Sequence, residues 1–161
     1  MAIEVREAAK DEQALIETLL DEYLQESSPF REVAVGATDA AGYPYLPYYW
    51  SEVDRLPFTI WSNNELAGFA LIRRIGDDHG WVMQVAEFFI KPEYRRQGIG
   101  KAAAVALWKQ FPGRWELQVM KGNRAAIEFW STCVKAQAQG WHMDEILADD
   151  GQRLCFHFEV R

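Results

Sequence analysis

The sequence predicts a single mixed α/β domain, and three observations lead to that prediction. The chain has 161 residues, which is about the length of one domain and enough to bury a core. Segments with the strand period of two alternate with segments at helical spacing, in the order β-α-loop-β-β-β-α-β-α-β-β. Neither an internal repeat nor a linker divides the chain, so we expect residues 1–161 to form one domain.

A strand and a helix are predicted first. Residues 3–7 alternate apolar and charged side chains, as a strand does. From Asp11 the apolar positions follow helical spacing, and residues 27–29 (Ser-Ser-Pro) end the helix. The apolar stripe consists of Leu15, Ile16, Leu19, Leu20, Tyr23 and Leu24. Residues 29–57 contain four prolines and predict one short helix and a long loop, which in a compact domain is usually functional.

Glycine, proline and asparagine bound the remaining elements. We expect a hairpin of 58–61 and 66–73 around the turn 62–65, a second turn at 76–80, and a strand over 81–90 that Pro92 ends. A helix over 98–110 and a strand over 115–119 follow. The chain then forms a helix from Asn123 to about Gln139 and a closing hairpin of 141–147 and 153–160 around the turn 149–151. Asn123 is a good N-cap, and Gly140 is the expected terminator of its helix.

The charge balance argues against one class of partner. Seventeen basic and 24 acidic residues give a net charge of −7, whereas a nucleic-acid binder normally carries a basic surface. The same balance suits a cationic acceptor somewhat better than an anionic one. No apolar run approaches the roughly 18 residues that span a membrane, and the first residues lack the features of a signal peptide. We therefore expect a cytoplasmic protein with no membrane or nucleic-acid partner.

Metal sites and disulfides are not expected. Cys133 and Cys155 stand apart without a CxxC pair, which favours reduced thiols in the cytosol. His79, His142 and His157 have no neighbour at ligand spacing, so we interpret them as structural.

The sharpest functional signal is residues 90–101, Ile-Lys-Pro-Glu-Tyr-Arg-Arg-Gln-Gly-Ile-Gly-Lys. A strand ends there, a short loop turns, and two glycines open a helix. Glycine lets a ligand approach the backbone closely, and the first helical N–H groups point outward with the positive end of the helix dipole. Arg95, Arg96 and Lys101 add positive charge, so we predict a phosphate cradle. A Rossmann fingerprint would need a third glycine, and a P-loop would need Gly-Lys-Ser/Thr after a longer loop.

Two motifs in this order resemble those of the GNAT acetyltransferase superfamily. Arg95-x-x-Gly98-x-Gly100, which follows residues 87–94, looks like the family's motif A. Residues 123–130 resemble the family's next motif, where an Asn starts a helix. The resemblance implies a GNAT fold, a mixed central sheet of about seven strands with flanking helices and a splay between the fourth and fifth strands.

The resemblance also implies where acetyl-CoA would bind as cosubstrate. It would lie in the splay between strands 82–90 and 115–119, with its pyrophosphate on the cradle. The implied positions are Phe89, Ile90, Arg95, Arg96, Gln97, Gly98, Ile99, Gly100, Lys101, Asn123 and Trp130. Phe89 and Ile90 would pair with the pantetheine arm through main-chain groups. Asn123 would either bond that arm or serve only as a helix N-cap.

Amine acetylation needs a base to deprotonate an ammonium, and Glu87 is the candidate. In strict alternation Glu87 shares a strand face with Val85 and Phe89, and apolar neighbours would raise the pKa of its carboxyl towards the useful range. Many family members carry the base one residue earlier, where this chain has Ala86. A one-residue slip changes the face unless a bulge restores it. The alternative is that Glu87 is a structural or solvated carboxylate.

The family's general acid is replaced in this chain. Relatives usually have Tyr after the Phe of the second motif, where this chain has Trp130, which cannot yield a proton at neutral pH. Either the CoA thiolate leaves unaided, with a pKa of roughly 8.5 by analogy with cysteine, or Tyr94 or Cys133 substitutes. Trp130 also shares an apolar stripe with Ile127 and Val134, so we expect it to pack in the core.

The aromatic run 43–50 is the predicted acceptor wall, because it occupies the family's variable substrate region. The candidate residues are Tyr45, Tyr48, Tyr49 and Trp50. Their faces could hold an ammonium by cation–π attraction, or the rings could simply cover the sheet.

These features favour an acetyl-CoA-dependent N-acetyltransferase that acts on a primary amine of a small molecule. A protein N-terminal or lysine acetyltransferase stays open, since the fold does not choose the acceptor. A non-catalytic acyl-CoA-binding module also stays open, because the family's Tyr is missing. The aromatic loop is compatible with a homodimer.

Overall fold

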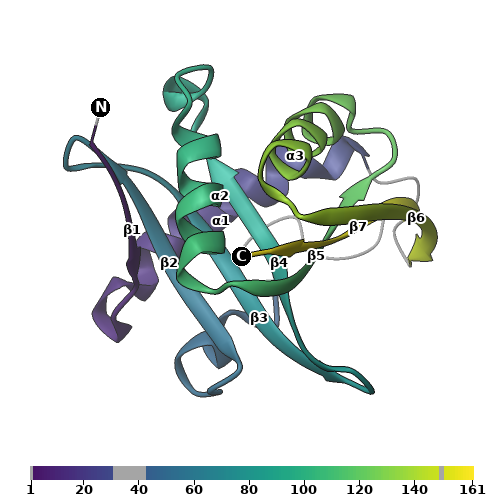
Figure 1. Ribbon diagram of the computed structural model, residues 1–161. Helices are drawn as coiled ribbons and strands as arrows, with labels where there is room; N and C mark the ends of the chain where they lie inside the picture. Colours follow the sequence, from purple (N-terminus) through teal and green to yellow (C-terminus); the bar gives the residue numbers. More distant parts are fainter. Residues whose placement is uncertain (1, 31–42, 149–150) are drawn as a thin grey trace.

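A seven-stranded sheet forms the centre of the computed structural model, which describes residues 2–30, 43–148 and 151–161. The strands pair in the order β1-β2-β3-β4-β5-β7-β6, and β4 with β5 is the parallel pair among antiparallel ones. Their bounds are β1 Ile3–Glu7, β2 Arg55–Ser62, β3 Glu65–Asp77, β4 Gly80–Ile90, β5 Gly113–Met120, β6 Gly140–Ala148 and β7 Gly151–Val160. This arrangement confirms the predicted mixed α/β fold (Figure 1).

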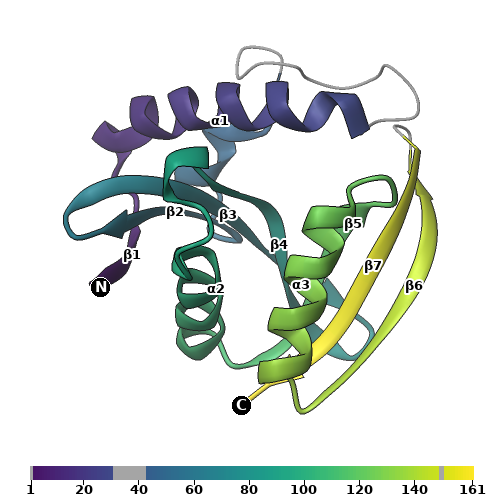
Figure 2. The same cartoon turned by 90° about the horizontal axis from the view of Figure 1, so that it is seen from above.

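The α-helices of the described part of the chain cover both faces of the sheet. Helix α1 (Gln13–Ser27) lies on one face, and α2 (Ile99–Gln110) and α3 (Arg124–Gln137) lie on the other (Figure 2). The apolar stripe of α1 packs against Phe69 and other side chains of β3 and β4. On the opposite face, Leu107 of α2 and Val134 of α3 pack with Ile72 and other strand residues. Leu15 departs from the predicted stripe, since it is 38% exposed.

The irregular region is partly described. Short 3-10 helices occupy Ser28–Phe30 and Leu46–Trp50, and β2 begins at Arg55 rather than at the expected Phe58. Residues 31–42 of the predicted loop and residues 149–150 of the predicted closing turn lie outside the described residues. Among the helices that the structure describes, none is long and apolar enough to cross a bilayer.

The prediction that Gly140 terminates α3 is wrong. The helix ends at Gln137, and Ala138 follows in an extended conformation with φ −81° and ψ 145°. The N–H of Gln139 then donates to the carbonyl of Glu159 on β7 at 2.8 Å. The chain therefore joins the sheet directly, and Gly140 opens β6 instead of capping the helix.

Strands β4 and β5 separate after three paired positions. Residues 83–85 pair with residues 115–117 in parallel register. Beyond these positions β4 continues on β3, and β5 continues on β7. The two facing edges therefore carry main-chain groups that no longer pair with each other, which confirms the predicted splay between the fourth and fifth strands.

A β-bulge lies at this separation. Leu71 of β3 is opposite Glu87, but the next residue, Ile72, is opposite Val85, so Ala86 is the extra residue. Val85 and Ile72 face the core under α2 and α3, whereas Leu71 and Ala86 pack on the α1 side. The predicted strict alternation between Val85 and Glu87 is therefore wrong, because the bulge separates their faces.

Candidate active site

Two cavities meet beside the bulge. The first has a volume of about 370 Å³, and we call it the tyrosine cavity. The second has a volume of about 660 Å³ and follows the separation of β4 and β5, and we call it the splay groove. The tyrosine cavity is lined by Tyr43, Tyr45, Tyr49, Arg55, Arg73 and Gln84, among others. Both cavities are lined by Ala86, Glu87, Gln118 and Arg153, which form the junction.

The splay groove contains most of the residues predicted to hold the cosubstrate. Its lining includes Phe89, Ile90, Arg95, Arg96, Gly98, Gly100, Lys101, Asn123 and Trp130. Two predicted positions do not line it. The side chain of Ile99 is 1% exposed and belongs to the core beneath α2. The side-chain amide of Gln97 donates to the carbonyl of Glu93 at 3.2 Å.

The loop before α2 has the backbone of a phosphate cradle. Arg96 and Gly98 have φ of 61° and 80°, and Gly98 is the N-cap of α2. Successive N–H groups in such a right- and left-handed sequence form concave anion sites, and the first turn of α2 adds its own unpaired donors. Gly100 serves packing as well, because a Cβ there would lie 3.1 Å from the ring of Phe129 on α3. The residues of the cradle thus suit a pyrophosphate.

Arg95 links three elements at the edge of the groove. Its Nε–H donates to the carbonyl of Ile90 at 2.8 Å, and its Nη2 contacts Oε1 of Glu26 on α1 at 2.7 Å. Its guanidinium also lies 5.5 Å from the ring centre of Phe89. Because its charge already has a carboxylate partner, Arg95 positions α1 over the groove as much as it supplies a positive field.

Asn123 acts as the predicted N-cap. Its side-chain oxygen accepts the N–H of Ala126 at 3.2 Å. Asn123 also lines the splay groove. The cap uses the oxygen only, so the amide N–H₂ remains as a donor that a ligand could use.

The junction contains the candidate base. Oε2 of Glu87 is buried, and Glu87 lines both cavities. Its negative charge contributes, after burial, to raising the pKa of Tyr43 and that of Tyr49, the latter to about 12. Both phenols therefore keep their protons near neutral pH. Because Ala86 lies on the same side of the sheet, the one-residue displacement from the family's usual base position does not turn this carboxylate away.

The two alternative proton donors lie elsewhere. The hydroxyl of Tyr94 donates to Oε2 of Glu65 at 2.6 Å, and Cys133 is buried in the core under α2 and α3. Neither residue lines the tyrosine cavity or the splay groove. Trp130 is 8% exposed, which confirms its predicted packing.

Replacing Trp130 with Tyr tests whether the position keeps a latent acid role. Its ring packs against Phe88 at 4.9 Å and Phe129 at 4.8 Å between centroids. We expect Trp130→Tyr to leave a void, to lower the unfolding free energy by about 1–3 kcal/mol, and to give no gain in kcat. Thermal melts and steady-state kinetics measure both. A variant that turns over faster at unchanged stability would contradict the packing role.

The predicted acceptor wall divides into two parts. Tyr45 and Tyr49 line the tyrosine cavity. Tyr48 is 45% exposed and lies outside its lining. Trp50 does not line the tyrosine cavity either. Its indole N–H donates to the carbonyl of Ala8 at 3.0 Å. The alternative role, covering the sheet, therefore describes Trp50 better than a role in the cavity does.

Several cavity residues were missed because no local motif marks them. They are Arg55, Arg73, Gln84, Gln118 and Arg153 in the tyrosine cavity and Tyr23 and Phe30 in the splay groove. Tyr43, which also lines the tyrosine cavity, belongs to the predicted aromatic run 43–50. Arg73, Gln84 and Gln118 are polar residues within predicted strands. Only the pairing of the strands shows that they face the same space.

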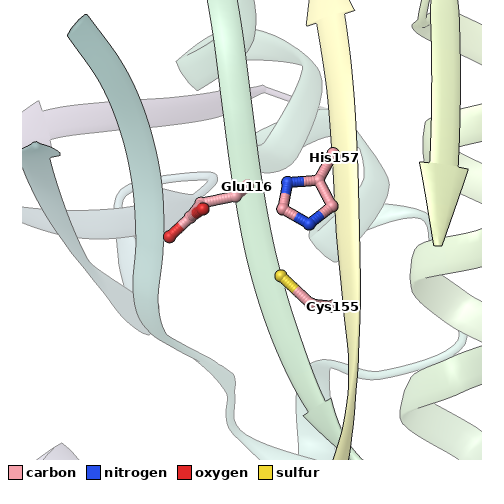
Figure 3. Close-up of side chains that lie close together, drawn as sticks. All are labelled: Glu116, Cys155 and His157. Carbon is pink, nitrogen blue, oxygen red and sulfur yellow. The ribbon is translucent and has the colours of Figure 1, made fainter. Parts of the chain in front are cut away.

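A polar cluster lies further along the sheet, across β5, β6 and β7. Donor atoms of Glu116, Cys155 and His157 lie within 4.8 Å of one another (Figure 3), as do those of His142, Asp144 and His157. The interpretation that His142 and His157 lack a neighbour at ligand spacing is wrong, because pairing of β6 with β7 stacks their rings at 4.6 Å.

Two of the three donors of the first group already have partners, and the third is a protonated thiol. Glu116 accepts the side-chain N–H of Gln84 at 3.0 Å, and its carboxylate turns away from the other two side chains (Figure 3). His157 Nε2 lies 3.2 Å from Oδ2 of Asp144. Burial raises the pKa of the Cys155 thiol to about 11, with smaller contributions from Glu116 and Asp144. A metal ion would have to displace these contacts and the thiol proton, and we assign it no role.

Solved N-acetyltransferase structures share this fold. The Thermoplasma acidophilum PaiA N-acetyltransferase in complex with coenzyme A has a TM-score of 0.66 and 15% identity, covering 96% of this chain and 98% of that one. The Vibrio cholerae spermidine N-acetyltransferase in complex with CoA and spermine has a TM-score of 0.66 and 15% identity, covering 98% of this chain and 95% of that one. The Escherichia coli ribosomal-protein-S18-alanine N-acetyltransferase has a TM-score of 0.59 and 16% identity, covering 99% of this chain and 93% of that one.

These likenesses show that the chain has the fold of these enzymes. Residues 13–133, well over half of the chain, match the model of the acetyltransferase (GNAT) family. The chain belongs to this family and is an acetyltransferase. No curated protein matches the sequence.

Proposed function

We propose that the chain transfers an acetyl group from acetyl-CoA to a primary amine of a small molecule, by direct attack in a ternary complex. The observation that carries this proposal is the junction, where Glu87 lines both the splay groove and the tyrosine cavity. Acetyl-CoA would occupy the groove, with its pyrophosphate on the cradle, and the acceptor would occupy the cavity. The thioester and the amine would then meet beside Glu87.

The proposed reaction forms one bond and breaks one. Glu87 accepts a proton from the acceptor ammonium, either directly or through a water molecule. The neutral amine attacks the thioester carbonyl, the C–N bond forms, and the C–S bond breaks with its electron pair on sulfur. The nitrogen then releases its second proton to solvent and becomes the amide N–H. Main-chain donors on the open edge of β4 suit the carbonyl oxygen. Since Tyr94 and Cys133 lie elsewhere, the thiolate leaves unaided and takes a proton from solvent.

The volume of the tyrosine cavity favours a small acceptor. Its 370 Å³ lies near the lower end of the usual range of ligand pockets, roughly 300–1,000 Å³. The relatives with the same fold acetylate a polyamine in one case and a ribosomal protein in another, so the fold itself gives no preference. The size of the cavity is the reason to place a small molecule first and a protein second.

Thiol release from acetyl-CoA with a panel of amines tests the proposal, together with calorimetric titration of CoA. We expect micromolar to millimolar CoA affinity and amine-dependent thiol release. Binding of CoA without thiol release for any amine would indicate a non-catalytic acyl-CoA-binding module. Absence of both would remove the proposed function.

A further inference from the structure

The tyrosine cavity is positively charged in a chain that is acidic overall. Among the described residues, its charged lining consists of Arg55, Arg73, Arg153 and the single carboxylate of Glu87. The net charge of the whole chain is −7, so this concentration of guanidinium groups is local. The charge of the cavity thus differs in sign from the charge that the sequence composition leads one to expect for the acceptor site.

Two of these arginines form a like-charge pair across the sheet. Arg55 of β2 is directly opposite Arg73 of β3, and like charges at such positions destabilise the pair. The Arg55 side chain is only 14% exposed and lies 3.4 Å from a carboxylate oxygen of Glu52, whose side chain is 50% exposed. Because that ion pair is open to solvent on one side, it offsets the repulsion between the two arginines only weakly. Arg73 has no ion-pair partner among the described residues. The folded protein therefore keeps two close cations at a cavity wall.

The rings of the cavity already carry a cation of the protein itself. The guanidinium of Arg55 lies 5.2 Å from the ring centre of Tyr45 and 5.4 Å from that of Tyr49. Binding of an acceptor ammonium on these ring faces, as the sequence analysis expected, is therefore unfavourable, because the ammonium would be repelled by Arg55. An anion placed there would meet a guanidinium held by two rings.

The two ends of the cavity differ. Glu87 lies at the junction with the splay groove, whereas Arg55 and Arg73 line the tyrosine cavity only. Along β3, the residue opposite Glu87 is Leu71, two positions before Arg73, which corresponds to roughly 7 Å along a strand. One small molecule can therefore reach the carboxylate at one end and the arginine pair at the other.

We propose that the acceptor is an amino-carboxylate, an amino-acid-like molecule whose carboxylate is bound by Arg55 and Arg73 while its amine faces Glu87. This inference rests on the proposed function and names the class of its acceptor. A guanidinium pair matches a carboxylate in geometry and charge. The same pair disfavours polyamines and other acceptors whose second group is cationic.

Matched acceptor pairs test the chemistry. We would compare amino acids with the amines that lack the carboxylate and with the corresponding amides, at equal chain length, by kcat/KM for thiol release. The carboxylate member of each pair should be preferred by roughly 10–100-fold, as expected for charged hydrogen bonds. A preference for the decarboxylated amine or for a polyamine overturns the proposal.

The variant Arg73→Gln and the control Arg74→Gln locate the effect. Arg74 is the next residue on β3, lies outside both cavities and sits 3.8 Å from Asp54. Arg73→Gln should lower kcat/KM for the carboxylate acceptor by roughly 10–100-fold and leave the amide acceptor within about threefold. Arg74→Gln should leave both unchanged. Equal losses for both acceptors in Arg73→Gln would contradict carboxylate recognition.

Two readouts besides turnover keep this proposal separate from the proposed function. Removing one charge of the pair should raise the Tm of the ligand-free protein by about 1–3 °C in Arg73→Gln. The carboxylate acceptor should raise the Tm of the wild type but not of the variant. Binding of the acceptor without acetyl transfer would overturn the proposed function alone, and acetyl transfer that ignores the carboxylate would overturn this inference alone.

Discussion

Glu87→Gln is expected to lower kcat by roughly 100-fold or more near pH 7, and the loss should shrink as the pH rises. At pH 7 a primary amine with a pKa near that of lysine, about 10.4, is almost entirely protonated. The base is then needed to create the nucleophile. Near pH 10 a large share of the amine is already neutral, and the variant should approach the wild type. A pH series of kcat for both proteins measures this.

The pH profile is not confused by the phenols of the cavity. Burial and the charge of Glu87 raise the pKa of Tyr43, and they raise that of Tyr49 to about 12. Both groups therefore stay protonated over the range of the experiment. Glu116→Gln is the matched control, since Glu116 lines neither cavity, and we expect its kcat within about threefold of the wild type. A small, pH-independent loss in Glu87→Gln would remove this residue from the mechanism.

The sequence predicted the groove better than the cavity, and the reason is local encoding. The cradle is built by consecutive residues, so Gly98 before α2 and Arg96 beside it can be recognised from order alone. Asn123 is likewise recognised because a helix cap is a local feature. In contrast, Arg55 and Arg73 belong to different strands and meet only through their register.

The bulge shows a second limit. Alternation predicts the face of a strand residue only while the strand is regular, and nothing in the residues from Val85 to Glu87 announces an extra position. The face of Glu87 therefore depended on pairing with Leu71, which the sequence does not reveal. The stacking of His142 on His157 was missed for the same reason, because it arises from strand pairing.

Lys101→Glu is expected to weaken CoA binding by roughly 100-fold without weakening the fold. Lys101 is in the first turn of α2, where a cation opposes the positive end of the helix dipole and a carboxylate is stabilising by about 0.3–1 kcal/mol. The wild type therefore keeps a residue that is unfavourable for the helix but faces the splay groove. Reversing its charge replaces attraction for a pyrophosphate by repulsion.

Lys109→Glu is the control with the opposite expectation. Lys109 is in the last turn of the same helix, where a cation is favourable, and it does not line the groove. Lys109→Glu should lower the Tm slightly and leave CoA affinity unchanged. Lys101→Glu should instead keep or raise the Tm of the ligand-free protein and lose CoA affinity most at low salt.

Acetyl-pantetheine, which lacks the pyrophosphate, separates the contacts further. Lys101→Glu should lower kcat/KM for acetyl-CoA towards the value for acetyl-pantetheine and leave the latter unchanged. Equal losses with both donors would show that Lys101 does not act on the pyrophosphate, and the cradle would then have to lie elsewhere.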